Sequence, residues 1–130
     1  ITLLIMGLIG GVFYREFTKF YAFTDATHLG KIHVHTLVLG FAVSLLVYLL
    51  AKDMNDVKVL KKPYEIYLTG LVFTVVNMVV IGIYEVVSEG DDVIVRAAID
   101  GTSGIGHIIL AVGIVWMFVR AYNLRLKSNK

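Results

Sequence analysis

The fold is decided by residues 30–51, which read GKIHVHTLVLGFAVSLLVYLLA. Between His35 and Lys52 no side chain in this stretch is charged. A helix needs about 20 mostly apolar residues to cross the hydrocarbon core of a bilayer, so residues 30–51 are predicted to span a membrane. Two further runs of this kind follow at 64–87 and 97–122. The chain therefore has at least three candidate membrane helices.

A shorter apolar run, ITLLIMGLIGGVFY, opens the chain at 1–14. We expect it to be the C-terminal part of a further span that begins before Ile1, because the chain starts inside the run without an initiator methionine. The 130 residues contain a single proline and no linker at which to divide off a second domain. The prediction is an all-α, integral membrane four-helix bundle, with residues 1–130 as one transmembrane domain.

The composition excludes several classes of protein. Hydrophobic residues make up 58% of the chain and the mean hydropathy is +0.80, whereas soluble domains are roughly 45–50% apolar. The absence of cysteine excludes disulfides, thiolate metal sites and covalently attached c-type haem. The net charge is only +2, and the charged residues lie between apolar runs. This pattern indicates a lipid bilayer as the partner and no nucleic acid.

The basic residues predict how the bundle is oriented. Eight of the 12 lie between the second and third spans or at and beyond the C-terminal end of the last span. These eight are Lys52, Lys58, Lys61, Lys62, Arg120, Arg125, Lys127 and Lys130, and the remaining four are Arg15, Lys19, Lys31 and Arg96. Since cytoplasmic loops carry the excess of lysine and arginine, we expect both termini in the cytoplasm.

Histidines within the spans are the first candidates for a functional site, because ionisable residues in membrane helices are rare and commonly functional. If the second helix enters the bilayer near residue 30, a rise of about 1.5 Å per residue places His33 and His35 roughly 5 to 8 Å deep. The same rise places His107 roughly 13 Å deep in the fourth helix. His28 is expected at the aqueous boundary. A cofactor between the second and fourth helices could therefore be reached from both.

Small residues accompany two of these histidines at helical spacing. The residues on the face of His33 are Gly30, Gly40 and Ser44, and those on the face of His107 are Ser103, Gly104 and Ala111. Such grooves let helices approach closely, and they also leave room for the flat face of a porphyrin. His35 lies about 200° around the helix from His33, so the two cannot both bind one iron.

These observations predict a b-type haem site in the outer half of the membrane, similar to a cytochrome b. His33 and His107 would be the axial ligands, with His35 as the alternate ligand from the second helix. The other cofactor-binding residues would be Gly40, Gly104 and Arg15. Arg15 is expected to pair with a haem propionate. Two filled axial positions favour electron transfer or haem handling and sensing over oxygen activation, so the site requires no enzymatic activity.

Two other functions fit the same residues. A zinc or copper site or transporter would join His33 or His35, together with His107, to an outer carboxylate. Candidates for that carboxylate are Glu85 and Asp100. A non-catalytic assembly subunit would instead use the histidines to hold helices together. The expected protein partners are a redox protein or further copies of the chain.

Three motifs carry a resemblance to a known family. They are GVFYREFTKF at 11–20, KIHVHTLVLGF at 31–41 and GTSGIGHIILAVG at 101–113. Together they resemble a family of small bacterial four-span membrane proteins known only as a domain of unknown function. This resemblance implies a multi-pass protein of the bacterial cell membrane. The HxH followed by glycine is also similar to helices of haem-copper oxidases and nitric-oxide-response membrane proteins, in which such histidines hold haem or metal.

Overall fold

The structure is a computed structural model that describes residues 1–52, 56–88 and 93–128, with the backbone alone at 93–96, 99, 100, 127 and 128. Its elements are α1 (Thr2–Phe20), α2 (Leu29–Val34), the π-helical segment η1 (His35–Ala42), α3 (Val43–Ala51), α4 (Lys58–Val87) and α5 (Val93–Ser128). Because α2, η1 and α3 follow one another without a break, we refer to Leu29–Ala51 as the α2–α3 helix. The described residues contain helices and no strand, which confirms the predicted all-α bundle.

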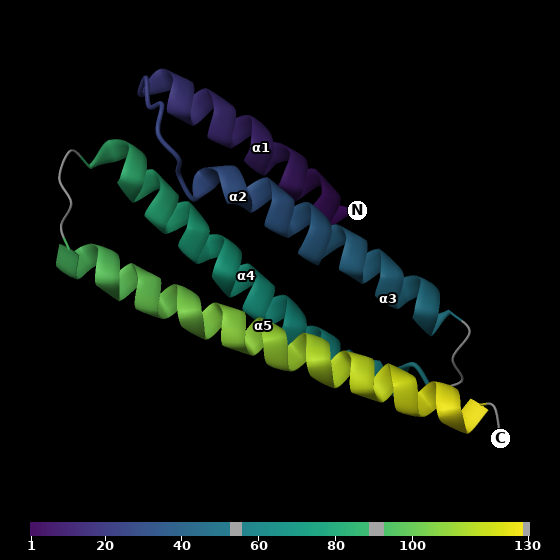
Figure 1. Cartoon of the computed structure of the whole chain (residues 1–130). Helices are drawn as coiled ribbons and strands as arrows, with labels where there is room; N and C mark the ends of the chain where they lie inside the picture. The colour runs from purple at the N-terminus through teal and green to yellow at the C-terminus, as the bar shows by residue number, and fades with distance from the viewer. Residues whose placement is uncertain (53–55, 89–92, 129–130) are drawn as a thin grey trace.

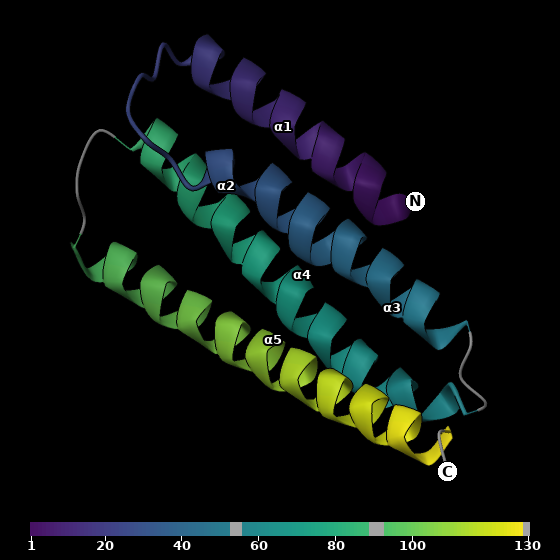
Figure 2. The same ribbon diagram turned by 45° about the vertical axis from the view of Figure 1, so that its right-hand side comes forward.

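The four helices run antiparallel to their neighbours in the chain (Figure 1). The α2–α3 helix lies between α1 and α4, and α5 packs along the other side of α4 (Figures 1 and 2). Among the described residues, α5 does not pack along the length of the α2–α3 helix. One end of the bundle carries the connection at 21–28, where α1 ends and α2 begins. We call it the 21–28 end; α4 also ends there and α5 begins there (Figure 1).

Within the part of the chain that the structure describes, three helical stretches are long and apolar enough to cross a membrane, namely Leu29–Ala51, Lys58–Val87 and Gly101–Leu126. They correspond to the predicted spans at 30–51, 64–87 and 97–122. The predicted first span at 1–14 lies within α1, which is not among the three. Three charged residues in the second half of α1 interrupt its apolar run: Arg15, Glu16 and Lys19. The chain is therefore a membrane protein with three candidate spans and a further apolar helix.

Two helix boundaries differ from the predicted ones because of local backbone bonding. α4 begins at Lys58, before the predicted start at 64, and contains Pro63. The missing N–H of Pro63 removes one helical hydrogen bond near the start of the helix, where the loss is tolerated. α1 ends at Phe20 and is followed by a turn in which Ala22 has a left-handed φ of 51°. In this turn the Phe23 N–H donates to Thr18 O at 2.9 Å. This closing turn is of the Schellman type, and it directs the chain back towards α2.

The core near the 21–28 end holds α2 against α4. Leu29 and Ile32 of α2 and Met78 and Val86 of α4 are buried in one cluster. Aromatic side chains of α1 and the connection pack against the cluster, including Tyr14, Phe17 and Phe23. Burying this apolar surface fixes the rotation of α2 and thereby the direction in which its histidines project.

Candidate histidine site

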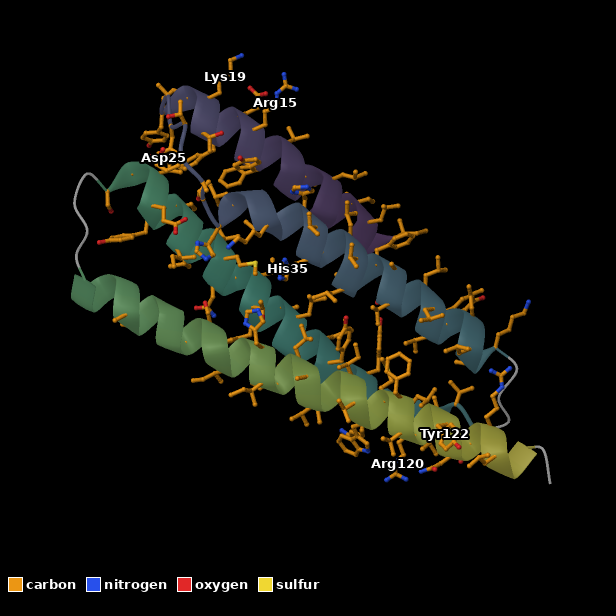
Figure 3. The ribbon with its side chains drawn as sticks, viewed as in Figure 1. Arg15, Lys19, Asp25, His35, Arg120 and Tyr122 are labelled. Atoms are coloured by element: carbon orange, nitrogen blue, oxygen red, sulfur yellow. The ribbon has the colours of Figure 1, made fainter. Side chains whose placement is uncertain are left out.

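The structure brings His35 and His107 together from two helices that are far apart in the chain. Their ring centroids are 6.4 Å apart and the ring planes are at 90°. His35 is the first residue of η1, and His107 lies in the middle of α5. Figure 3 shows His35 on the side of the α2–α3 helix that faces α4 and α5. The separation is also within the range of an edge-to-face contact between two rings.

The hydrogen bonds of the two imidazoles define which nitrogen is free in each. Nδ1 of His35 lies 3.0 Å from Lys31 O, and Nδ1 of His107 lies 2.8 Å from Ser103 O. A carbonyl oxygen only accepts hydrogen bonds, so Nδ1 is the donor in both rings. In a neutral imidazole the lone pair is then at Nε2. Histidines that bind metals are commonly oriented by such a second hydrogen bond to a carbonyl.

His33 faces a different helix. A Cβ placed on Gly11 of α1 would lie 3.6 Å from the His33 Cβ and 3.7 Å from its Cγ, so the ring packs against α1. Its Nδ1 is buried and has no hydrogen-bond partner among the described residues. The sequence favoured His33 opposite His107, with His35 as the alternate. The structure instead places His35 opposite His107, because the core turns the His33 face of α2 towards α1.

The π-helical segment His35–Ala42 begins at the candidate ligand. π-helical turns within α-helices are rare and are frequent at functional sites. At the start of this segment, side chains donate to backbone carbonyls of the preceding turn: His35 to Lys31 O, and Thr36 Oγ1 to Ile32 O at 2.8 Å. No residue pattern in 35–42 distinguishes this segment from an ordinary apolar helix, so it could not be predicted from the sequence.

Polar side chains also donate hydrogen bonds to the backbone carbonyls at the far end of the π-helical segment. Tyr67 OH of α4 donates to Leu39 O, and Ser44 Oγ donates to Gly40 O. Tyr64 OH donates in turn to Ser44 Oγ at 2.8 Å. These bonds satisfy carbonyls inside an apolar span, where an unpaired polar group is costly. α4 therefore helps to hold the segment that begins with His35.

The glycines predicted to border the cofactor have different surroundings. A Cβ on Gly40 would lie 3.4 Å from Leu71 of α4 and 3.5 Å from Leu3 of α1, so helix packing fills this groove. At Gly104, by contrast, a Cβ would meet no atom within 4 Å. Gly104 lies three residues before His107 and is exposed. Of the two glycines, only Gly104 has open space beside it.

The charged residues predicted to serve the site lie in several places. Arg15 has an 81% exposed side chain near Glu16, at an Nε–Oε1 distance of 3.8 Å. Figure 3 shows Arg15 and Lys19 on the outer side of α1, away from His35. The structure thus does not bring Arg15 to the histidine pair. The Arg96 side chain lies outside the described residues.

Glu85, a candidate carboxylate for the alternative metal site, binds His28. His28 Nδ1 and Glu85 Oε1 are 2.7 Å apart, and the His28 backbone N–H donates to Glu85 Oε2 at 2.8 Å. Next to this pair, Thr27 Oγ1 donates to Gly82 O at 3.2 Å. From the sequence, His28 and Glu85 are both expected at the outer membrane boundary, but their pairing is not predicted. Their shared depth was the signal that could have predicted the contact.

No group of three or more histidine, aspartate or glutamate side chains gathers within the part of the chain that the structure describes. The side chain of Asp100, the other predicted carboxylate, lies outside that part. The described histidine site therefore consists of two imidazoles, with small and apolar residues on the adjoining helical faces.

Comparison with known proteins places the chain in a family. The family model described as Protein of unknown function (DUF2871) matches residues 1–124. No curated protein and no solved structure matches the chain. The family description names neither an activity nor a ligand. Since the match covers nearly the whole chain, the protein belongs to this family, DUF2871.

Proposed function

We propose that this chain is a membrane b-type haem-binding protein in which His35 and His107 are the axial ligands. The proposal keeps the predicted cofactor and the helices that hold it, and it exchanges His33 for the alternate ligand His35. The observation that carries it is the 6.4 Å separation of the two imidazoles, with Nε2 free in both rings.

The separation supports one coordination geometry over another. A metal ion lies about 2.0–2.1 Å from a ligating imidazole nitrogen, which itself lies about 1.2 Å from the ring centroid. Two imidazoles on opposite sides of one metal ion then have centroids about 6.4 Å apart, whereas two on a tetrahedral ion have centroids about 5.2 Å apart. The observed 6.4 Å matches the trans arrangement, which is that of two axial haem ligands. Two imidazoles on opposite sides of a metal ion can each rotate about the nitrogen–metal–nitrogen axis. The 90° angle between the two ring planes is therefore compatible with this trans arrangement.

The surroundings of the pair also suit a flat ligand. α4 packs against both the α2–α3 helix and α5, while these two helices do not pack along each other within the described residues. Residues that flank the histidines on the two helices are exposed, among them Val38, Ala42, Gly104 and Ala111. A porphyrin ring entering between the imidazoles would therefore displace few packed side chains.

Ligation by two histidines determines the class of function. A haem held by both His35 and His107 would supply reversible one-electron chemistry and would have no open position for oxygen. The chain would hold the iron and exclude water from it in an apolar environment. We propose electron transfer, or haem handling or sensing, in a bacterial cell membrane. The distribution of basic residues favours a cytoplasmic location for both termini, and the histidine pair would then lie nearer the outer face.

A zinc or copper protein is the second candidate. It would use the same two imidazoles, which suit both ions, but a zinc ion prefers four tetrahedral ligands. The described residues provide only two histidines here, and their 6.4 Å centroid separation matches ligands on opposite sides of a metal ion. This geometry favours haem as the first candidate to test.

The test is an absorption spectrum of detergent-purified protein expressed with ample haem, oxidised and then reduced with dithionite. We expect a Soret band with sharp reduced α and β bands, lost in His35→Ala and in His107→Ala. His33→Ala is the matched control and should retain the spectrum, because His33 lies two residues away on another face.

Three results would contradict the proposal. A featureless spectrum of the wild-type protein despite full haem supply would exclude haem, and metal analysis of the same sample would then test zinc and copper. Loss of the bands in His33→Ala but not in His35→Ala would restore the pairing predicted from sequence. Retention of the bands in all three variants would place the cofactor elsewhere.

A further inference from the structure

We infer that Lys31 binds the anionic edge of the ligand held by His35 and His107, namely the carboxylates of a haem. This inference rests on the proposed function and goes beyond it, because it assigns the orientation of the cofactor in the bundle. It also replaces Arg15, the propionate partner predicted from the sequence, with a residue of another helix.

Lys31 shares a helical face with the candidate ligand. It lies four residues before His35, and residues at this spacing lie one above the other on a helix. Its carbonyl accepts the hydrogen bond from His35 Nδ1 at 3.0 Å, which shows that the two residues are one turn apart on the same side. Lys31 is exposed and lies about 6 Å nearer the 21–28 end of the bundle than His35 does.

The opposite helix leaves room in the same direction. Both α2 and α5 begin at the 21–28 end, so Gly104 is displaced from His107 towards that end, as Lys31 is from His35. A Cβ at Gly104 would meet no atom within 4 Å. A group extending from the histidine pair towards the 21–28 end would thus meet open space on α5 and a cation on α2.

Other described cations at this end are less well placed. Arg15 lies near Glu16 on the outer side of α1, and Lys19 extends from the same side of α1 (Figure 3). His28 is held by the Glu85 carboxylate at 2.7 Å. Lys31 is therefore the described cation that shares a face with the candidate ligand.

The chemistry of lysine suits this role. An ammonium group and a carboxylate form a charge-assisted hydrogen bond, which is stronger in an apolar surrounding than in water. The four-carbon stem can lie along the apolar helix surface while the charged end reaches the membrane boundary. A porphyrin carries both of its carboxylates on one edge, so this contact would direct that edge towards the 21–28 end.

A cation beside the cofactor also affects its reduction. Adding an electron to the iron lowers the positive charge of the site, and a nearby ammonium group stabilises the reduced form by Coulomb attraction. Removal of the Lys31 charge should consequently lower the midpoint potential. It should also speed the loss of haem several-fold, because the contact to the carboxylates is lost.

The experiment compares haem-loaded Lys31→Met with haem-loaded Lys19→Met, a matched loss of a lysine at the same end of the bundle. Both residues are exposed, and circular dichroism would verify that both variants keep their helices. Redox titration and transfer of haem to an acceptor protein are the readouts. We expect a lower midpoint potential and several-fold faster haem loss in Lys31→Met alone, and recovery towards wild type in Lys31→Arg.

A second measurement tests the carboxylates directly. The wild type and Lys31→Met are loaded with the dimethyl ester of haem, which has no free carboxylate. The difference in the rate of haem loss between the two proteins should then disappear if Lys31 binds the carboxylates, because neither protein can make the contact.

The outcomes separate this inference from the proposed function. If the wild-type protein binds no haem, both are wrong. If haem binds with dependence on His35 and His107, but Lys31→Met behaves as wild type or as Lys19→Met, the assignment of Lys31 alone is wrong. A difference in the rate of haem loss that persists with the ester would likewise overturn it, because Lys31 would then retain the haem without the carboxylates.

Discussion

α5 meets α4 through glycines, whereas towards the α2–α3 helix it extends an imidazole. A Cβ on Gly113 would collide with the backbone of Tyr67, and one on Gly106 would come within 2.7 Å of Thr74 Oγ1. Next to Gly106 in the chain, His107 faces His35 across 6.4 Å between ring centroids. α5 is thus in close backbone contact with α4, whereas the imidazoles of His107 and His35 lie between α5 and the α2–α3 helix.

The difference shows that small residues in a membrane helix serve two purposes. Without a hydrophobic drive between helices in lipid, close approach through glycine supplies much of the packing energy, as at Gly106 and Gly113. Gly104 belongs to the same helix but borders open space. The glycines of the α4–α5 interface are therefore expected to contribute stability, and Gly104 is expected to contribute room for a ligand. Four substitutions test this comparison, in order of decreasing effect on stability.

Gly113→Leu should have the largest effect on stability. Its side chain would require the backbones of α4 and α5 to separate at Tyr67, and overpacking of this kind costs about 3 kcal/mol. Unfolding in mixed detergent micelles, followed by circular dichroism, measures the change. Gly101→Leu is the control and should unfold like wild type, because a Cβ there meets no atom within 4 Å. Equal destabilisation by both substitutions would show that the close contact at Gly113 is unimportant.

Tyr67→Phe should have the next largest effect. Tyr67 is fully buried, and its hydroxyl donates to Leu39 O at the end of the π-helical segment. Leaving that carbonyl without its donor should destabilise the bundle by about 1–2 kcal/mol in the same unfolding experiment. Tyr48→Phe, at a residue that is 66% exposed, is the control. A stability equal to that of Tyr48→Phe would mean that the carbonyl needs no side-chain donor.

Asn77→Leu should have a smaller effect. Thr102 Oγ1 of α5 donates to Asn77 Oδ1 at 2.9 Å, and hydrogen bonds between membrane helices contribute about 0.6 kcal/mol on average. Val76→Leu, at an exposed neighbour, controls for the change in side-chain size. A loss as large as that of Gly113→Leu would indicate that polar contacts, and not glycine packing, hold α5 to α4.

Gly104→Leu should change stability least, by less than about 0.5 kcal/mol, because its side chain enters open space. The same side chain would occupy space beside His107, so we expect a weaker haem spectrum at equal protein. Gly101→Leu should unfold like Gly104→Leu and keep the spectrum. The comparison fails if Gly104→Leu binds haem as well as wild type, or if it unfolds as readily as Gly113→Leu.

The helices could be predicted from the sequence because the bilayer restricts which sequences can cross it. An apolar run such as residues 37–51 must satisfy its backbone hydrogen bonds within itself, so it forms a helix wherever it lies. Two boundaries differ from the predicted ones, since Pro63 is tolerated near the start of α4 and the charged end of α1 continues the helix to Phe20. Carbonyls of the π-helical segment accept hydrogen bonds from distant residues such as Tyr67, and no local sequence pattern specifies these donors.

The sequence by itself determined that the chain is a helical membrane protein, that the histidines lie on the second and last helices, and that His33 and His35 face different ways. Periodicity and hydropathy are local properties, and they require no knowledge of the neighbours. Only the tertiary structure decided that His35 faces His107 while His33 packs against α1. The rotation of a helix about its axis depends on the side chains it buries, here Leu29 and Ile32 against α4, and these contacts join residues distant in the chain.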